Sequence, residues 1–237
     1  TDAEMAAELN RCFASAFGQD GKTIGSPKSF FNGTSHLTTV QFPTESVMAK
    51  LSALKPSSAP GPDKIHPRLL RECARELATP LSIIFNKSMS EGVLPDEWKA
   101  TNISPIYKNC AVNYRPINLA SVPAKVMESI IKDELLDHLR NNDLIIRSQH
   151  GFLPGRSCST NLVEYLNIVT RTLDQGSSFD AILVDFQKAF DKVPFDGMLE
   201  KCKAHGISGQ LLQWLHDWTT NRRQRVVLNG VESTWLD

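Results

Sequence analysis

Apolar residues recur at intervals of three and four along most of this chain, the spacing that places them on one face of a helix. Glycine and proline punctuate these stretches and indicate where they end. Because proline is tolerated in the first turn of a helix, Pro67 and Pro80 are each expected to open one. The stripes predict helices over residues 1–18, 45–54, 67–77, 80–91, 121–139, 162–173, 198–205 and 211–218.

Short runs without the helical interval predict a few strands. Residues 101–107 alternate between apolar and polar, and Pro105, which has no backbone N–H to donate, indicates an edge position. Asn229 and Gly230 stand between two runs rich in β-branched residues and predict a hairpin with a type I′ turn. The four apolar residues 181–184 predict a short strand covered on both faces. We therefore expect an α+β chain, helix-rich with few strands.

The composition narrows the classes of protein to consider. A chain of 237 residues with 41% hydrophobic content can bury a sizeable core. Its 26 basic and 26 acidic side chains cancel, so a nucleic-acid site would have to come from local clusters such as Arg222, Arg223 and Arg225. The five cysteines are scattered without zinc-ligand spacing. No apolar run reaches the ~20 residues of a membrane span, and the N-terminus shows no targeting signal.

Asp185 follows the predicted buried strand and is the strongest candidate for chemistry. A carboxylate at the end of a strand can hold a divalent metal ion over a sheet. The aromatic ring of Phe190, just beyond the turn, could close over a sugar bound there. The alternative is that Asp185 only caps a helix starting near Gln187, a common role for aspartate.

Five motifs in a fixed order favour the chemical interpretation. The motifs are SAPGPD at residues 58–63, WKATNISPIYK at 98–108, NYRPINLASV at 113–122, QHGFLPGRS at 149–157 and VDFQKAFD at 184–191. Together they resemble the reverse transcriptase domain of non-LTR, LINE-like retrotransposons of the jockey and CR1 type.

The resemblance implies a role for each matching residue. Asp185 would be the first catalytic aspartate of the palm and a ligand of Mg²⁺, with the backbone carbonyl of Phe186 as a further ligand. Phe190 would be the gate that rejects a ribose 2′-hydroxyl. Lys108 and Arg115 would bind the triphosphate of the incoming nucleotide. The residues implied to hold the template are Gly61, Asp63, Gln149, Gly155 and Arg156.

The resemblance also implies a right-hand polymerase fold, with fingers and an incomplete palm. Residues 42–237 would form part of the domain, and residues 1–41 the linker before it. The PQG and YxDD motifs of the family are not found, and no Asp-Asp pair occurs, so we expect the chain alone to be inactive. The implied partners are an RNA template, a DNA primer and dNTPs, inside the cell. The alternatives are a non-catalytic RNA- or RNP-binding module and a pseudogene relic.

Overall fold

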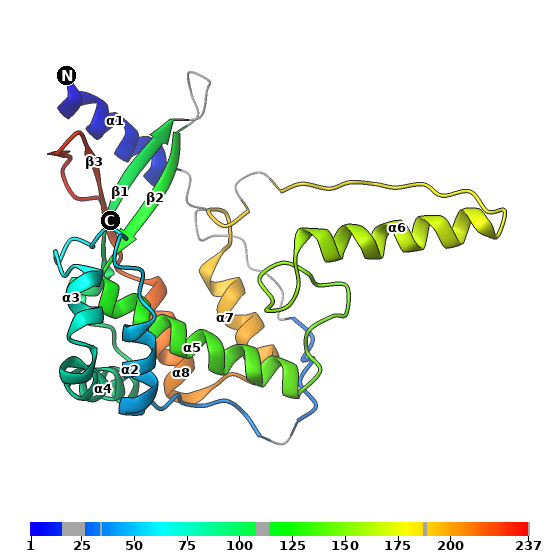
Figure 1. The fold of residues 1–237 in the computed structure, drawn as a ribbon, viewed down its shortest axis with the longest axis horizontal. Helices are drawn as coiled ribbons and strands as arrows, with labels where there is room; N and C mark the ends of the chain where they lie inside the picture. Colours follow the sequence, from blue (N-terminus) through cyan, green and yellow to red (C-terminus); the bar gives the residue numbers. More distant parts are fainter. Residues whose placement is uncertain (16–26, 34, 108–113, 187–188, 237) are drawn as a thin grey trace.

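A computed structural model describes residues 1–15, 27–33, 35–107, 114–186 and 189–236. Within these ranges the chain forms eight α-helices, one 3₁₀ helix and a sheet of four strands (Figure 1). The helices are α1 (Asp2–Ala14), α2 (Thr44–Ser52), α3 (Pro67–Glu72), α4 (Ala74–Glu91), the 3₁₀ helix η1 (Asp96–Lys99), α5 (Val122–Asn141), α6 (Cys158–Asp174), α7 (Phe195–Ala204) and α8 (Gly209–Thr219). The strands are β1 (Ala100–Tyr107), β2 (Tyr114–Ala120), β3 (Arg223–Leu228) and β4 (Val231–Glu232). The α+β prediction is confirmed.

The strands lie in the order β2-β1-β3-β4, so the sheet joins two distant parts of the chain. Strands β1 and β2 form an antiparallel hairpin over their whole length. Strand β3 runs parallel to β1 but pairs only with its first four residues, from Ala100 to Ile103. Pro105 lies beyond that pairing and faces Pro116 of β2. The predicted edge position is therefore right for the outer half of β1 and wrong for its inner half.

The predicted hairpin near the end of the chain is confirmed. Asn229 and Gly230 both have positive φ, +50° and +81°, as a type I′ turn requires. Helix α1 packs on β3 and buries Ala6 and Phe13 against Ile103 and Val226 (Figure 1). The expected linker thus begins with a helix that covers one part of the sheet.

The main core lies among α2, α4, α5 and α8 and not on the sheet (Figure 1). Phe85 of α4 is fully buried and makes edge-to-face contacts with Phe42 and Trp98, at centroid distances of 5.6 and 5.8 Å. Trp214 of α8 is also buried, and its indole N–H donates to the hydroxyl of Ser88 at 3.0 Å. The apolar faces of these helices are thus buried in the core, as the helical spacing of their residues predicts.

A buried ion pair connects η1 to α8. The Nζ of Lys99, whose side chain is 6% exposed, lies 2.9 Å from Oδ1 of Asp217. The other carboxylate oxygen of Asp217 accepts a hydrogen bond from the backbone N–H of Leu94 at 2.7 Å. Both oxygens are thus used, which offsets the cost of removing the two charges from water.

One predicted helix start is wrong. The helix predicted over residues 67–77 is interrupted at Cys73, and Pro80 lies inside α4 instead of opening a helix. Pro80 is exposed, so water can reach the carbonyl of Glu76 that would otherwise accept a hydrogen bond from residue 80. Ser121 stands at the N-cap of α5, but its buried hydroxyl caps nothing and has no hydrogen-bond partner in the described part of the chain.

The predicted buried strand at residues 181–184 is also wrong. Together with α6 it forms an arm, residues 158–186, that projects away from the helical core, the extended segment running back beside the helix (Figure 1). Ile182 and Leu183 are 90% and 91% exposed, and no residue of the arm is buried. A strand needs a neighbour for its backbone hydrogen bonds, and none of the described strands lies beside this segment.

None of the helices in the described ranges combines the length and the apolar composition needed to cross a bilayer.

Candidate functional site

Asp185 lies near the end of the exposed arm, in the extended segment, and is itself exposed. Its carboxylate has no ion-pair or hydrogen-bond partner among the residues that the structure describes. The neighbouring ring of Phe186 is 76% exposed. Residues 189–192 form turns, so no helix that Asp185 would cap is found in the described residues that follow it.

The donors near Asp185 have the chemistry that Mg²⁺ prefers but are too few to hold it. A carboxylate and the carbonyl of Phe186 are hard oxygen ligands, while Mg²⁺ takes six ligands in an octahedron. No group of three histidine, cysteine or acidic side chains that could bind a metal ion exists in the described ranges. Any complete site must draw its other ligands from elsewhere.

Phe190 contacts a residue of another predicted motif. Its ring meets that of Phe152 edge-on, with the centroids 5.7 Å apart, although both rings are mostly exposed. Phe152 itself has a positive φ of +63°, unusual for a bulky residue. The structure thus brings the QHGF and VDFQKAFD motifs together through one aromatic pair.

The loop that carries the predicted template residues is held by its own hydrogen bonds. The Gln149 side chain donates to the carbonyl of Gly151 at 3.0 Å. The guanidinium of Arg156 donates to the carbonyl of Arg147. Gly155 has a φ of +77° in open space, so glycine is needed there for its backbone conformation and not to avoid a clash. Arg156 therefore folds back onto its loop.

His150 organises this loop and was not among the site residues predicted from the sequence. Its side chain is 8% exposed, and its two ring nitrogens lie 2.9 Å from Oγ1 of Thr160 and 2.7 Å from Oε2 of Glu164. Both partners belong to α6. Thr160 also completes a capping box with Ser157. That box is the sequence signal that could have placed the loop at the start of a helix.

Arg115, one of the two residues predicted to bind the triphosphate, lies on the β1–β2 hairpin. Arg115 is the second residue of β2, faces Ile106 across the ladder and is exposed. Tyr107 and Tyr114, one on each strand, lie with ring centroids 5.3 Å apart next to it. Lys108 falls outside the described residues.

The SAPGPD turn docks against the junction of β2 and α5. A Cβ atom added to Gly61 would lie 2.6 Å from the carbonyl carbon of Ala120 and from the backbone nitrogen of Ser121. Asp63 accepts a hydrogen bond from the backbone N–H of Ile65 at 3.2 Å through Oδ1. Its Oδ2 is buried without a partner in the described part of the chain. Glycine is therefore required at position 61 because of close packing.

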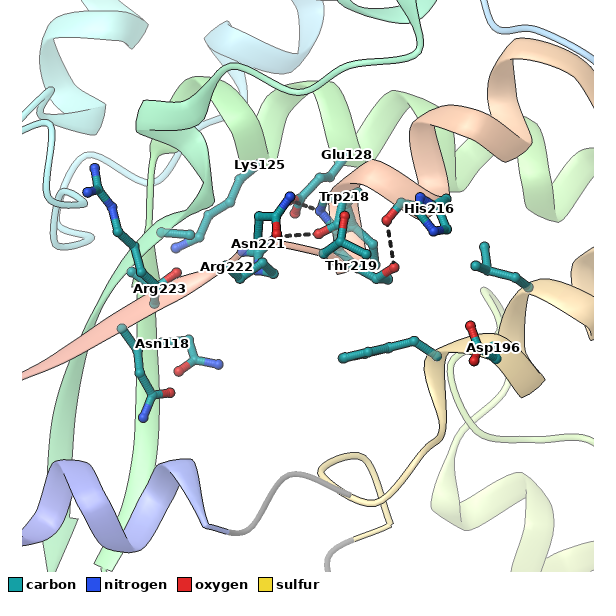
Figure 2. A pocket seen from close by; sticks show the side chains of 16 residues that line it. Asn118, Lys125, Glu128, Asp196, His216, Trp218, Thr219, Asn221, Arg222 and Arg223 are labelled. Atoms are coloured by element: carbon teal, nitrogen blue, oxygen red, sulfur yellow. Dashed lines mark hydrogen bonds between the residues drawn. The ribbon is translucent and has the colours of Figure 1, made fainter. Parts of the chain in front are cut away.

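A cavity of about 750 Å³ lies between the start of α5, the end of α8, the start of α7 and strand β3 (Figure 2). The indole N–H of Trp218 donates to Oε1 of Glu128 at 2.7 Å across its rim. Arg222 donates to the carbonyl of Trp218 at 3.0 Å and lies 5.6 Å from the centre of its ring. The sequence singled out Arg222 only as a member of a basic cluster.

Comparison with known proteins identifies the family. The model of the family described as reverse transcriptase (RNA-dependent DNA polymerase) matches residues 106–234, more than half of the chain. That range includes Lys108, Arg115, Asp185 and Phe190.

The curated relatives point to one group of mobile elements. The RNA-directed DNA polymerase from mobile element jockey of Drosophila funebris is 28% identical over 195 residues, 80% of this chain and 21% of the relative. The probable RNA-directed DNA polymerase from transposon BS of Drosophila melanogaster is 26% identical over 164 residues, 67% of this chain and 18% of the relative. The chain spans about a fifth of the length of these relatives. It belongs to the reverse transcriptase family and is a jockey-type member of it.

Proposed function

We propose that this chain is part of an RNA-directed DNA polymerase of a non-LTR retrotransposon, contributing the fingers and the first carboxylate of the palm. The observation that carries the proposal is the family match over residues 106–234, which contains Asp185 and Phe190. The exposed carboxylate of Asp185, five residues before Phe190, whose ring contacts that of Phe152, supports it.

In this proposal Asp185 and the carbonyl of Phe186 would bind Mg²⁺. The ion would supply charge stabilisation for nucleotidyl transfer when bound. Two protein oxygens leave most of its coordination positions open, so substrate, water or residues elsewhere in the protein must fill them. For this reason we expect the chain by itself not to extend a primer.

The hairpin and Phe190 would orient the incoming nucleotide. Arg115 suits a triphosphate because its planar guanidinium can donate two parallel hydrogen bonds to phosphate oxygens, and Lys108 would add a point charge. Phe190 would lie against the sugar and exclude a 2′-hydroxyl by contact.

The template would run over two surfaces. One is the SAPGPD turn with Gly61 and Asp63, which packing fixes against α5. The other is the loop with Gln149, Gly155 and Arg156, which α6 holds through His150. Residues 42–237 would then be part of the polymerase domain, and residues 1–41 would precede it.

Primer extension tests the proposal. The longer parent protein that contains this chain is assayed on poly(rA) with oligo(dT), dTTP and Mg²⁺, as wild type and as Asp185→Ala. We expect the substitution to lower the rate by about a thousandfold or more, since charge stabilisation at the reacting phosphate is lost. Asp191→Ala removes a nearby carboxylate with no assigned role and should leave the rate nearly unchanged. Extension that survives Asp185→Ala would refute the assignment.

A non-catalytic RNA-binding module is the second candidate. The shortage of carboxylate ligands around Asp185 in the described residues favours it. In that case RNA binding would weaken with salt and with loss of Arg115 or Arg156, while the parent protein would show no extension at all. Failure of the chain to bind RNA at low salt would exclude this candidate.

A further inference from the structure

The cavity beside Trp218 is separate from Asp185 and from the template loop. Three cationic side chains line it: Lys125 from the first turn of α5, Arg222 from the segment that joins α8 to β3, and Arg223 from the start of β3 (Figure 2). His216 adds a group that can become cationic. Two regions far apart in the sequence thus deliver positive charge to one cavity.

The positive charge in this cavity exceeds the negative charge, because Lys125, Arg222 and Arg223 line it with two carboxylates, Glu128 and Asp196. Among the described residues Lys125, Arg222 and Arg223 form no ion pair, whereas Glu128 spends one carboxylate oxygen on the indole N–H of Trp218. Burial lowers the pKa of Arg222, and the charge of Glu128 opposes that effect. A partly buried guanidinium without a direct counter-ion is costly, and an anionic ligand would offset the cost.

The rest of the lining suits a phosphate ester with organic groups attached. Asn118, Asn221 and Gln224 offer amide donors and acceptors, and Phe195 and Leu199 supply an apolar wall. The cavity is also larger than a single inorganic anion needs.

Cationic and aromatic groups continue beyond the cavity along β3. The guanidinium carbons of Arg223 and Arg225 lie 5.2 and 4.5 Å from the centre of the Trp235 ring. Arg225 is paired with Glu232, but its position over the ring still extends the basic surface. An extended track of arginines and stacked aromatics fits successive units of a strand better than one compact triphosphate.

We infer that this cavity and the adjoining face of β3 bind the sugar-phosphate backbone of a nucleic-acid strand, with a phosphate between Lys125, Arg222 and Arg223. The inference rests on the proposed function and adds to it a contact surface outside the predicted template residues. Because phosphate contacts carry no sequence information, binding at this cavity should not depend on base sequence.

The test measures binding of a fluorescent single-stranded RNA to the 237-residue chain by anisotropy, over a series of salt concentrations. The variants are Lys125→Gln and Arg223→Gln, both at exposed positions, with Lys87→Gln of α4 as the matched exposed control. We expect each cavity variant to raise Kd about three- to tenfold and to lower the salt slope by about 0.7, the value for one lost contact on a single strand. Lys87→Gln should bind as wild type does, and urea unfolding verifies that all three variants fold.

Binding by Arg156→Gln and competition by tripolyphosphate distinguish failure of this inference from failure of the proposed function. If Arg156→Gln weakens binding while both cavity variants bind like wild type, the inference fails and the proposed function stands. If the wild-type chain binds no RNA at low salt, both fail. If tripolyphosphate competes at the cavity but the RNA affinity is insensitive to Lys125 and Arg223, the cavity is a nucleotide site and the inference is overturned.

Discussion

The helical core and the arm are built from equally apolar residues but are packed in opposite ways. In the core, Phe42, Phe85 and Leu211 are fully buried between helices. In the arm, residues 158–186, α6 presents Leu162 and Leu166 to solvent at 60% and 57% exposure, and no residue is buried. The arm has apolar residues like those of the core helices, but no described element packs against them.

The residues that stabilise the fold and the catalytic aspartate proposed above therefore lie in different parts of the chain. The core holds the hairpin and the cavity in place through contacts within the described residues. The arm and the loop before it carry Asp185, Arg156 and Phe152, for which packing partners are scarce. The arm with Asp185 therefore depends most on a further partner, such as a strand beside residues 181–186, whereas Arg115 and the SAPGPD turn are held by the rest of the fold.

The largest expected effect is the difference in unfolding free energy lost by truncating one residue of the core and one residue of the arm. Phe85→Ala removes a buried ring from the core and should lower the free energy of unfolding by about 3–5 kcal/mol. Leu166→Ala in the arm should change it by less than about 0.5 kcal/mol, since the side chain is largely exposed. Urea unfolding of both variants measures the difference. An equal loss for the two would show that the arm is packed in solution and would break the comparison.

A smaller loss of stability is expected from a substitution at Gly61, where the SAPGPD turn packs against the junction of β2 and α5. Gly61→Ala places a methyl group 2.6 Å from the backbone of Ala120 and Ser121, which cannot move aside easily. Overpacking of this kind costs about 1–3 kcal/mol. Gly155→Ala is the matched control, because no atom lies within 4 Å of its added methyl and only the strain of its positive φ remains. Thermal unfolding that ranks Gly155→Ala as the more damaging would contradict the docking of the turn.

The contact of His150 with Glu164, which joins the loop before α6 to the arm, is expected to stabilise the loop with little effect on global stability. Glu164→Ala leaves His150 without its carboxylate partner and should free the loop while changing global stability by less than about 1 kcal/mol. Trypsin cleavage after Arg156 should then accelerate about fivefold. Glu164→Gln, which can still accept from the imidazole, should restore most of the protection, and Glu134→Ala on α5 should behave as wild type. Unchanged cleavage in Glu164→Ala would show that His150 does not hold the loop.

The smallest expected effect is a pH dependence of the unfolding free energy that comes from Asp133, a half-exposed residue of α5. Desolvation raises the pKa of Asp133, but hydrogen bonds and charge from Lys50 and Lys132 outweigh it and hold that pKa below its usual value. A lowered carboxyl pKa adds stability above the unfolded value of about 3.9, and this stability is lost as pH falls through the folded value. Because the side chain is 45% exposed, the loss should be about 0.5 kcal/mol or less.

Comparing wild type with Asp133→Asn isolates this contribution. The difference in unfolding free energy between the two proteins should be smaller at pH 3 than at pH 5.5, because the Asp133 carboxylate of wild type gains protons as pH falls toward its lowered pKa. A gap that widens at low pH would have the wrong sign and would refute the assignment.

The sequence predicted best what depends on neighbouring residues in the chain. All eight helical stripes lie on helices of the structure, and the Asn229-Gly230 turn is as expected, because periodicity and turn conformation are local properties. Only the start predicted at Pro80 is wrong, since α4 begins before it and an exposed position tolerates a proline inside the helix.

Features that depend on distant partners could not be predicted in this way. Residues 181–184 have the composition of a buried strand, but composition does not supply the neighbouring strand. The cavity joins Lys125 to Arg222 across 97 positions of the sequence, and the parallel pairing of β1 with β3 and the packing of α5 on α8 bring them together. The roles of Asp185, Phe190, Lys108 and Arg115 remain predictions that rest on the family.

The facing prolines of the β1–β2 hairpin have a consequence for association between copies of the protein. Neither Pro105 nor Pro116 has an N–H, so this rung must be one of the ladder's non-hydrogen-bonded pairs, and the missing donors lie on the two outer edges. Beyond the end of β3 an incoming strand would find no donor at this rung on either side. The projecting hairpin is thereby protected against edge-to-edge aggregation, although both of its edges are open to solvent.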